Sequence, residues 1–215
     1  MCEVFKVAQQ RPVREGMTIS KDAKMGQKTR VTYFSLGSGT SISRESYDAT
    51  VFYVGAEGCA TFLVGDRIQK EELAEGDLLC IPGKMLCGVE SAAQAVYTEI
   101  LIKQEVSMNQ IVKAGEVMKL KELISYEEGS ISNLDIASNE HMKFVLMAFD
   151  KDTGLQPHRA PGNAIVFALD GKATIQYEGK DHVISAGENF RFEKNGLHSI
   201  QADERFKMAL LLVIE

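Results

Sequence analysis

Two stretches of this 215-residue chain can be laid on each other, and this internal repeat constrains the fold more than any other feature. Glu57–Thr61 matches Asp170–Thr174 at an offset of 113 positions, and Ala74–Asp77 matches Ser185–Glu188 at an offset of 111. The change in offset corresponds to a shorter hairpin in the second half. Because both halves also end in an apolar run, the sequence predicts one β-domain used twice.

Short β-branched and aromatic runs, separated by Gly, Asp and Ser, fill both halves, as is typical of a sandwich or barrel. Glycine-bearing stretches at 55–58 and 170–171 are expected turns. One stretch, Glu116–Ile124, has the apolar spacing of a helix. We expect strands at Val31–Leu36, Thr50–Val54, Ala60–Val64, Leu78–Ile81, Ala95–Ile102, Lys143–Phe149, Asn163–Leu169, Ala173–Tyr177, His182–Ser185, Asn189–Phe192 and Phe206–Ile214.

Composition excludes several classes of partner. The net charge of −6 and the pI near 5.4 do not favour the basic face that nucleic-acid binding needs. The sequence has neither the long apolar run of a membrane span nor a signal-peptide pattern, so we expect a cytoplasmic protein without a membrane partner. Free thiols are expected because no paired zinc-type spacing joins the four cysteines, Cys2, Cys59, Cys80 and Cys87.

Two histidines are placed where strands deliver them to a common site. His158 lies in a polar loop that runs into the strand at 163–169. His198 follows the strand at 189–192 and a turn-like Lys194–Gly196 segment. Two histidines at the ends of separate strands can meet inside one barrel, and we expect His158 and His198 to do so. His141 and His182 are expected to be exposed and unrelated to this site.

The glycine and histidine spacings resemble those of the cupin superfamily, and in particular of bicupins. Gly187 precedes His198 by eleven residues, as in the second cupin motif, and Gly76 precedes Cys87 by the same distance. His158 and Gly171 have the separation of the first motif. The resemblance implies an all-β chain of two tandem jelly-roll barrels, the double-stranded β-helix of cupins, with a short connecting helix.

We divide the chain on this basis into three parts. Residues 1–103 form a histidine-free N-terminal cupin domain with a structural role, 104–139 form a connector with the short helix, and 140–215 form a C-terminal cupin domain with a pocket. The resemblance implies that two such barrels pack in the manner of a cupin dimer. The expected assembly is therefore a monomer that is a pseudo-dimer of domains, or a homodimer.

The resemblance also shows which metal ligands this sequence lacks. Cupin enzymes bind one divalent metal through three histidines and a glutamate, a donor set suited to iron, manganese, nickel or zinc. The corresponding positions in the second half are His158, Ala160, Ala164 and His198. In the first half they are Glu45, Tyr47, Val51 and Cys87, so that half is not expected to hold the metal.

Three interpretations of the histidine pair stay open. The first is a small-molecule pocket in which His158, His198 and the neighbouring Arg159 bind an anion or carbonyl compound, in a non-catalytic binding or sensing protein. The second is a pair of leftover pocket histidines. The third is a metal site, in a dioxygenase or isomerase type of enzyme that uses His158 and His198. We rank them in this order, and the sequence does not decide whether the protein is an enzyme.

Overall fold

The computed structural model describes residues 3–215, so Cys2 lies outside the described part. The chain divides into two compact units, each described here by itself. The N-terminal unit contains Val7–Val106 and Gln110–Lys119. The C-terminal unit contains the residues up to Lys6, Ser107–Asn109 and Leu120–Glu215. Among the described residues, no helix is long and apolar enough to cross a membrane.

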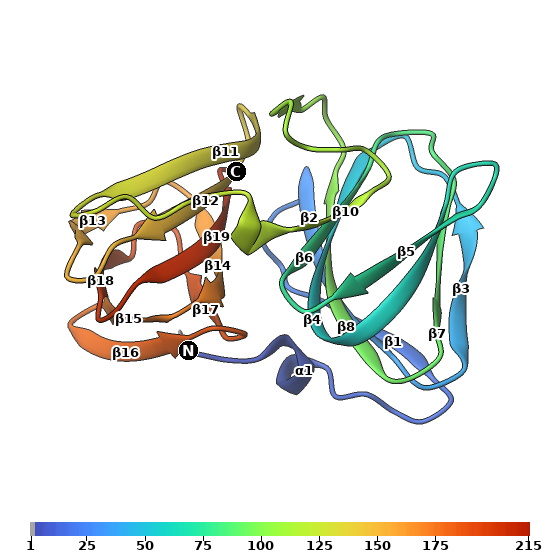
Figure 1. Cartoon of the computed structure of the whole chain (residues 1–215), viewed down its shortest axis with the longest axis horizontal. Coiled ribbons are helices and arrows are strands. Elements are labelled where there is room, and N and C mark those ends of the chain that lie inside the picture. The colour runs from blue at the N-terminus through green and yellow to red at the C-terminus, as the bar shows by residue number, and fades with distance from the viewer. Residues whose placement is uncertain (1–2) are drawn as a thin grey trace. The chain divides into compact units, whose positions relative to one another are not determined.

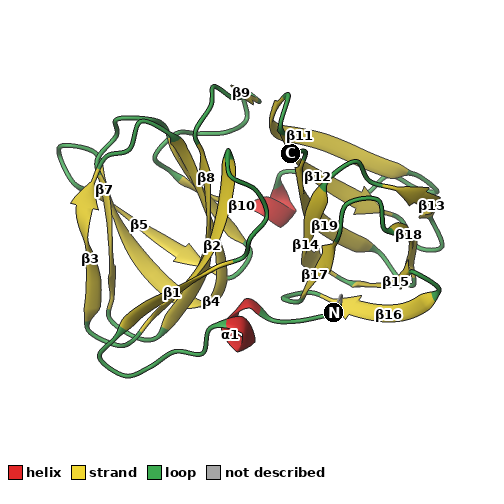
Figure 2. Ribbon diagram, turned by 180° about the vertical axis from the view of Figure 1, so that it is seen from behind, coloured by secondary structure: helices red, strands yellow, loops and turns green. Residues whose placement is uncertain are grey.

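The N-terminal unit is built from two layers of antiparallel strands that share one long strand. Figure 1 shows these strands in blue to green, and Figure 2 shows the same unit from behind. One layer has the order β1 (Thr18–Asp22), β2 (Thr29–Leu36), β8 (Ala95–Ile102), β4 (Thr50–Val64), β6 (Asp77–Ile81) and β10 (Val117–Lys119). The other consists of β3 (Thr40–Glu45), β7 (Cys87–Ser91), the far half of β4 and β5 (Gln69–Ala74), and a short helix, α1 (Val7–Gln10), precedes the unit's first strand.

The C-terminal unit, drawn in yellow to red in Figure 1, has the same arrangement, except that the sixth strand of its larger sheet lies at the opposite edge. Its larger sheet has the order β17 (Asn189–Phe192), β14 (Asn163–Asp170), β19 (Phe206–Val213), β12 (Met142–Phe149), β11 (Ile131–Asn139) and β9 (Ser107–Met108). Its smaller sheet has the order β13 (Gly154–Arg159), β18 (Leu197–Ala202), β15 (Lys172–Tyr177) and β16 (Lys180–Ser185). The all-β prediction is confirmed, and each expected strand overlaps an observed one.

The two expected glycine turns are wrong, because the chain bends there without reversing. β4 passes from one layer to the other, with a bulge between Gly55 and Glu57. At the matching place in the second half, the chain passes through Gly171 from β14 to β15, which belong to different sheets. Gly58 and Gly171 both have a φ of 69°, and a Cβ on either would collide with a backbone carbonyl of a neighbouring strand. Glycine is therefore required at both bends.

The expected helix at Glu116–Ile124 forms only as a single short turn. Val117–Lys119 is strand β10, which pairs with β6, and the helix is limited to a 3₁₀ turn, η1 (Leu120–Glu122). The backbone N–H of Val117 donates a hydrogen bond to the Glu71 carboxylate at 2.7 Å. Sheet pairing thus satisfies backbone groups that a helix would have paired internally, and tertiary context overrides a weak helical pattern.

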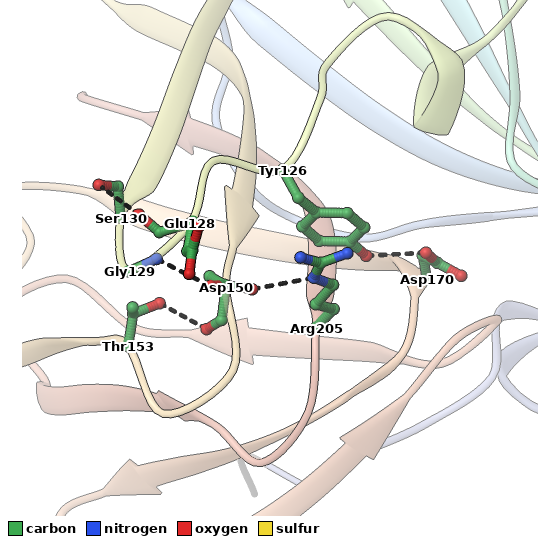
Figure 3. Close-up of polar contacts among 8 residues, drawn as sticks. All are labelled: Tyr126, Glu128, Gly129, Ser130, Asp150, Thr153, Asp170 and Arg205. Atoms are coloured by element: carbon green, nitrogen blue, oxygen red, sulfur yellow. Dashed lines mark hydrogen bonds and ion pairs between the residues drawn. The ribbon is translucent and has the colours of Figure 1, made fainter.

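A polar cluster holds the segment after η1 on the C-terminal unit (Figure 3). The Tyr126 hydroxyl donates to the Asp170 carboxylate at 2.7 Å, and the Arg205 guanidinium lies over the Tyr126 ring. Arg205 Nε donates to Asp150 at 2.9 Å, and the same carboxylate accepts the N–H of Gly129. These two donors hold the pKa of Asp150 below its usual value. The cluster explains how a polar, glycine-bearing stretch becomes ordered without an apolar core of its own.

Candidate functional site

His158 and His198 meet, as the sequence predicted. They are directly paired residues on the antiparallel strands β13 and β18 of the C-terminal unit. Their ring centroids lie 4.3 Å apart, and the His198 ring also stacks on Phe192 at 4.1 Å. His198 is only 7% exposed, whereas His158 is exposed to solvent. One buried and one accessible imidazole therefore stand side by side.

Backbone carbonyls determine which ring nitrogen is protonated. His158 Nδ1 lies 2.8 Å from the Gln156 carbonyl oxygen, and His198 Nδ1 lies 2.9 Å from the Gly196 carbonyl oxygen. A carbonyl oxygen only accepts hydrogen bonds, so the proton is on Nδ1 in both neutral rings. Each Nε2 then carries a lone pair and can accept a hydrogen bond or bind a metal. An anion or carbonyl compound, the ligand expected from the sequence, would need a donor, which the neutral pair does not offer at Nε2.

Burial keeps His198 in this neutral form. Desolvation lowers the pKa of His198 below its usual 6.5, and the neighbouring His158 lowers it further, while the bond to Gly196 acts in the opposite direction. A base with a lowered pKa is unprotonated at neutral pH. His198 is therefore an acceptor at its Nε2 under ordinary conditions.

The two histidines line a cavity of about 240 Å³ in the C-terminal unit. Its walls come from both sheets, and most of them are apolar. Such an enclosure, with a few polar groups at one side, is the usual form of a small-molecule site. The lining residues are Leu155, His158, Arg159, Ala160, Pro161, Ala164, Phe192, His198, Ile200, Met208, Leu210 and Leu212.

Arg159 lines this cavity, and its guanidinium already interacts with two protein groups. Its Nη1 donates to the backbone carbonyl of Asn195 and lies 3.6 Å from the Glu178 carboxylate. More than half of its side chain is exposed, so the ion pair with Glu178 is weak. Arg159 can therefore turn toward an anionic group in the cavity at little cost.

The matching position in the N-terminal unit carries a different pair, as the repeat predicted. Glu45 and Cys87 are directly paired on β3 and β7, after the same register shift that precedes the histidines in the second unit. Burial raises the pKa of the Cys87 thiol to about 12, so it stays protonated and is not a nucleophile. The expectation of free thiols is confirmed for the described cysteines, of which Cys80 and Cys87 are buried and Cys59 is exposed.

The residues present do not supply the donor set of a cupin metal site. Ala160 and Ala164 line the cavity at the positions where the resemblance puts a histidine and the glutamate. In the described part of the chain, no group of three or more His, Cys, Asp or Glu side chains could hold a metal ion. A catalytic zinc site ordinarily has three protein ligands, and here the protein offers two imidazoles.

The other two histidines lie away from the cavity, but they are half-buried and not exposed as expected. His141 lies 2.9 Å from the Glu140 carboxylate, and the His182 ring packs on Phe190. Sequence reasoning missed the apolar wall of the site, which includes Leu210 and Leu212. Residues of the last strand alternate between the two faces of the sheet. From the sequence, the residues that line a cavity could not be distinguished from those that pack in a core.

Comparisons with known proteins agree with this architecture. Residues 145–214 match a family model described as a cupin domain. A cupin 2 conserved barrel domain protein from Leptotrichia buccalis has a similar structure, with a TM-score of 0.86 and 24% identity, over 98% of this chain and 96% of that one. No curated protein sequence matches the chain.

More distant structures share the fold. Salicylate 1,2-dioxygenase from Pseudoaminobacter salicylatoxidans, in a structure with gentisate, has a TM-score of 0.70 and 12% identity, over 99% of this chain and 81% of that one. AerE from Microcystis aeruginosa has a TM-score of 0.53 and 14% identity, over 92% and 98%. At such identities the likeness concerns the fold alone. The fold is all-β and of the cupin barrel type, and the domain match supports the cupin superfamily.

Proposed function

We propose that the C-terminal barrel binds a small molecule with an apolar body and a hydroxyl group, and that it does so without catalysing a reaction. The observation that carries this proposal is the pair of Nε2 lone pairs of His158 and His198 at the side of a mostly apolar cavity. A buried acceptor that finds no donor costs free energy, so this site favours a ligand that donates a hydrogen bond.

Arg159 extends the site to ligands that also carry an acid group. Its guanidinium is the charged side chain among the lining residues, and its contacts to Asn195 and Glu178 lie at the surface. A planar guanidinium suits a carboxylate, which it can bind through two parallel hydrogen bonds. A hydroxylated aromatic or aliphatic acid of small size is therefore the ligand class that matches the three polar groups together.

The N-terminal barrel completes a two-domain protein of the bicupin type in this proposal. The main strands of both units follow one another in the same order. Glu45 pairs with Cys87 in the first unit at the position where His158 pairs with His198 in the second. We further propose domains at 1–103 and 140–215 with a connector between them, in a cytoplasmic protein with a small-molecule ligand and with no nucleic-acid or membrane partner. We propose a monomeric pseudo-dimer, with a homodimer as the alternative.

One observation favours a second candidate, a metal-dependent enzyme of dioxygenase or isomerase type that uses His158 and His198. Histidines that bind metals ordinarily donate their other ring N–H to a backbone carbonyl or a carboxylate, and both rings here do so. The missing third protein ligand argues against this candidate. Iron, manganese, nickel or zinc would need water or a bound ligand to complete its coordination.

Calorimetric titration of the metal-free protein with salicylate tests the first proposal. Salicylate carries a ring, a hydroxyl and a carboxylate, and benzoate lacks only the hydroxyl. We expect salicylate to bind, benzoate to bind several-fold more weakly, and the His158→Ala/His198→Ala variant to lose about tenfold in affinity or more. The matched control is His141→Ala/His182→Ala, which leaves the cavity unchanged. Equal affinity of the cavity variant and the natural protein would contradict the proposal.

Elemental analysis of protein purified without an affinity tag separates the two candidates. Near-stoichiometric iron, manganese, nickel or zinc in the natural protein, and none in His158→Ala/His198→Ala, would favour the enzyme. Metal absent from both proteins after growth with added metals would exclude it.

A further inference from the structure

The N-terminal barrel has an acidic residue on its inner face. Thr32, Glu99 and Tyr53 are directly paired on the neighbouring strands β2, β8 and β4, so their side chains lie on one face of the sheet. Tyr53 belongs to the apolar core of this unit, and so do Tyr97 and Leu101, which flank Glu99 on the same face of β8. The Glu99 side chain therefore points into the barrel.

This carboxyl group is buried and lacks a partner of its own. Glu99 is 7% exposed, and within residues 3–215 no hydrogen bond or ion pair joins its carboxyl group to another residue. Burial raises its pKa, and the charge of Arg30 offsets this only in part. Arg30 is exposed and lies two residues along β2 from Thr32. A carboxylate that has lost most of its hydration and has no direct partner is costly to keep charged, so this position favours a cation beside it.

The groups around Glu99 are oxygen and sulfur atoms and aromatic rings. Its charge acts on Tyr53, Tyr97 and Cys87, in each case raising a pKa that burial already raises. The Tyr53 and Tyr97 rings meet edge to face at 5.6 Å, and both pack on Phe62. Within residues 3–215, neither phenol hydroxyl makes a hydrogen bond, to the Glu99 carboxylate or to any other group. The carboxyl and the two phenols thus share the inner face of the sheet without pairing to one another.

We propose that the N-terminal barrel holds a second ligand site, formed by Glu99, Tyr53 and Tyr97, that takes a small organic ammonium cation. A carboxylate supplies the opposite charge, phenol oxygens accept ammonium N–H groups, and aromatic rings attract cations through their faces. A divalent metal fits less well, because no three suitable side chains meet in the described part of the chain.

This site goes beyond the function proposed for the other barrel and does not rest on it. At the position equivalent to Glu99 the C-terminal unit has Leu210, which is paired with Val145 and Val166 in an apolar row. The N-terminal unit has Thr32, Glu99 and Tyr53 where the C-terminal unit has a row of apolar residues. The two barrels are therefore suited to ligands of different charge and polarity.

Titration of the full chain with ethylammonium chloride, followed by amide NMR, tests the site. Sodium chloride keeps the ionic strength constant, and propan-1-ol is the uncharged probe of similar size. We expect saturable shifts of N-terminal-unit signals with ethylammonium, and none with propan-1-ol. Glu99→Gln is expected to weaken binding about tenfold or more, and Tyr53→Phe to weaken it by a smaller factor. Glu75→Gln, the same substitution at an exposed position of the same unit, is the matched control and is expected to bind as the natural protein does.

Two outcomes would overturn the site: shifts that do not saturate, and equal binding by Glu99→Gln and the natural protein. Salicylate binding to Glu99→Gln keeps this test separate from the first proposal. It is expected to be unchanged, and the dispersion of the N-terminal-unit amide signals reports that the variant is folded.

Discussion

The two barrels share a strand order but fill their interiors differently. In the N-terminal unit four rings pack together, those of Phe34, Tyr53, Phe62 and Tyr97. The equivalent positions of the C-terminal unit hold Met147, Val166, Ile175 and Met208, which are all aliphatic. Phe34 pairs with Tyr97 across the sheet in the same register as Met147 pairs with Met208.

The rings of the C-terminal unit stand at other positions, among them those of Tyr177, Phe190 and Phe192, so aliphatic side chains surround Met208 beside the cavity. Aromatic side chains bury more area than aliphatic ones and lock together through edge contacts. Where smaller side chains occupy the same backbone positions, the sheets do not collapse to close the gap, and Ala160 and Ala164 enlarge it. The comparison indicates that two units with one strand order can differ in the ligands they suit through the size and polarity of a few inward-facing residues.

The largest expected effect comes from breaking the aromatic cluster. Tyr97 is 2% exposed and touches three other rings, so we expect Tyr97→Ala to lower the free energy of unfolding by about 3–5 kcal/mol. At the equivalent position Met208 faces the cavity and lacks partners on one side, so Met208→Ala should cost about 2 kcal/mol. Urea denaturation with amide exchange to assign each unit measures both. A larger loss for Met208→Ala would contradict the comparison.

Replacing the buried carboxyl with the residue of the other barrel should stabilise the protein. Glu99→Leu copies Leu210 and removes an unpaired polar group, so we expect the N-terminal unit to gain about 1–3 kcal/mol at neutral pH. Because burial raises the Glu99 pKa above the unfolded value, its destabilising effect appears as the pH rises through that raised pKa. The gain should therefore shrink as the pH falls to about 4, where the carboxyl is protonated in both states, and urea denaturation at two pH values can check this.

Filling the cavity should make the second barrel resemble the first. Ala164→Val copies Val51, its equivalent on β4, and adds two methyl groups to the lining. We expect a gain of about 0.5–1 kcal/mol in stability and a clear loss of salicylate affinity, because the ligand and the new methyl groups compete for one space. Thermal denaturation and calorimetric titration measure these effects. Undiminished affinity would mean that the ligand lies outside this cavity.

The smallest expected effect is a pH dependence that belongs to the C-terminal unit alone. The folded-state pKa of His198 is below 6.5, so the unfolded chain binds its proton more readily. Stability from this residue is fully present above pH 6.5 and is lost as the pH falls through the lowered pKa. We expect urea midpoints of the C-terminal unit to fall between about pH 7 and pH 5, and to fall less in His198→Gln. Equal slopes in both proteins would rule out His198 as the cause.

Much of the candidate site followed from sequence alone. His158 and His198 were placed together from one repeat, because equal strand lengths and glycine bends keep two copies in the same register. The tautomer of the two rings could not be predicted from the sequence. It depends on the carbonyls of Gln156 and Gly196, and the backbone conformation places these carbonyls beside the rings. The ion pair between Arg159 and Glu178 could not be predicted either, because the two residues are distant in the sequence and only the fold brings them together.

The sequence by itself determined many of the strands and the pairing of equivalent positions, because alternation and glycine spacing are local or repeated signals. Only the tertiary structure decided that Glu116–Ile124 would pair as a strand and end in a single 3₁₀ turn, that Glu99 would be buried, and that a cavity would lie beside His158 and His198. These outcomes depend on how side chains from strands distant in the sequence pack together inside the unit, and no local sequence pattern contains that information.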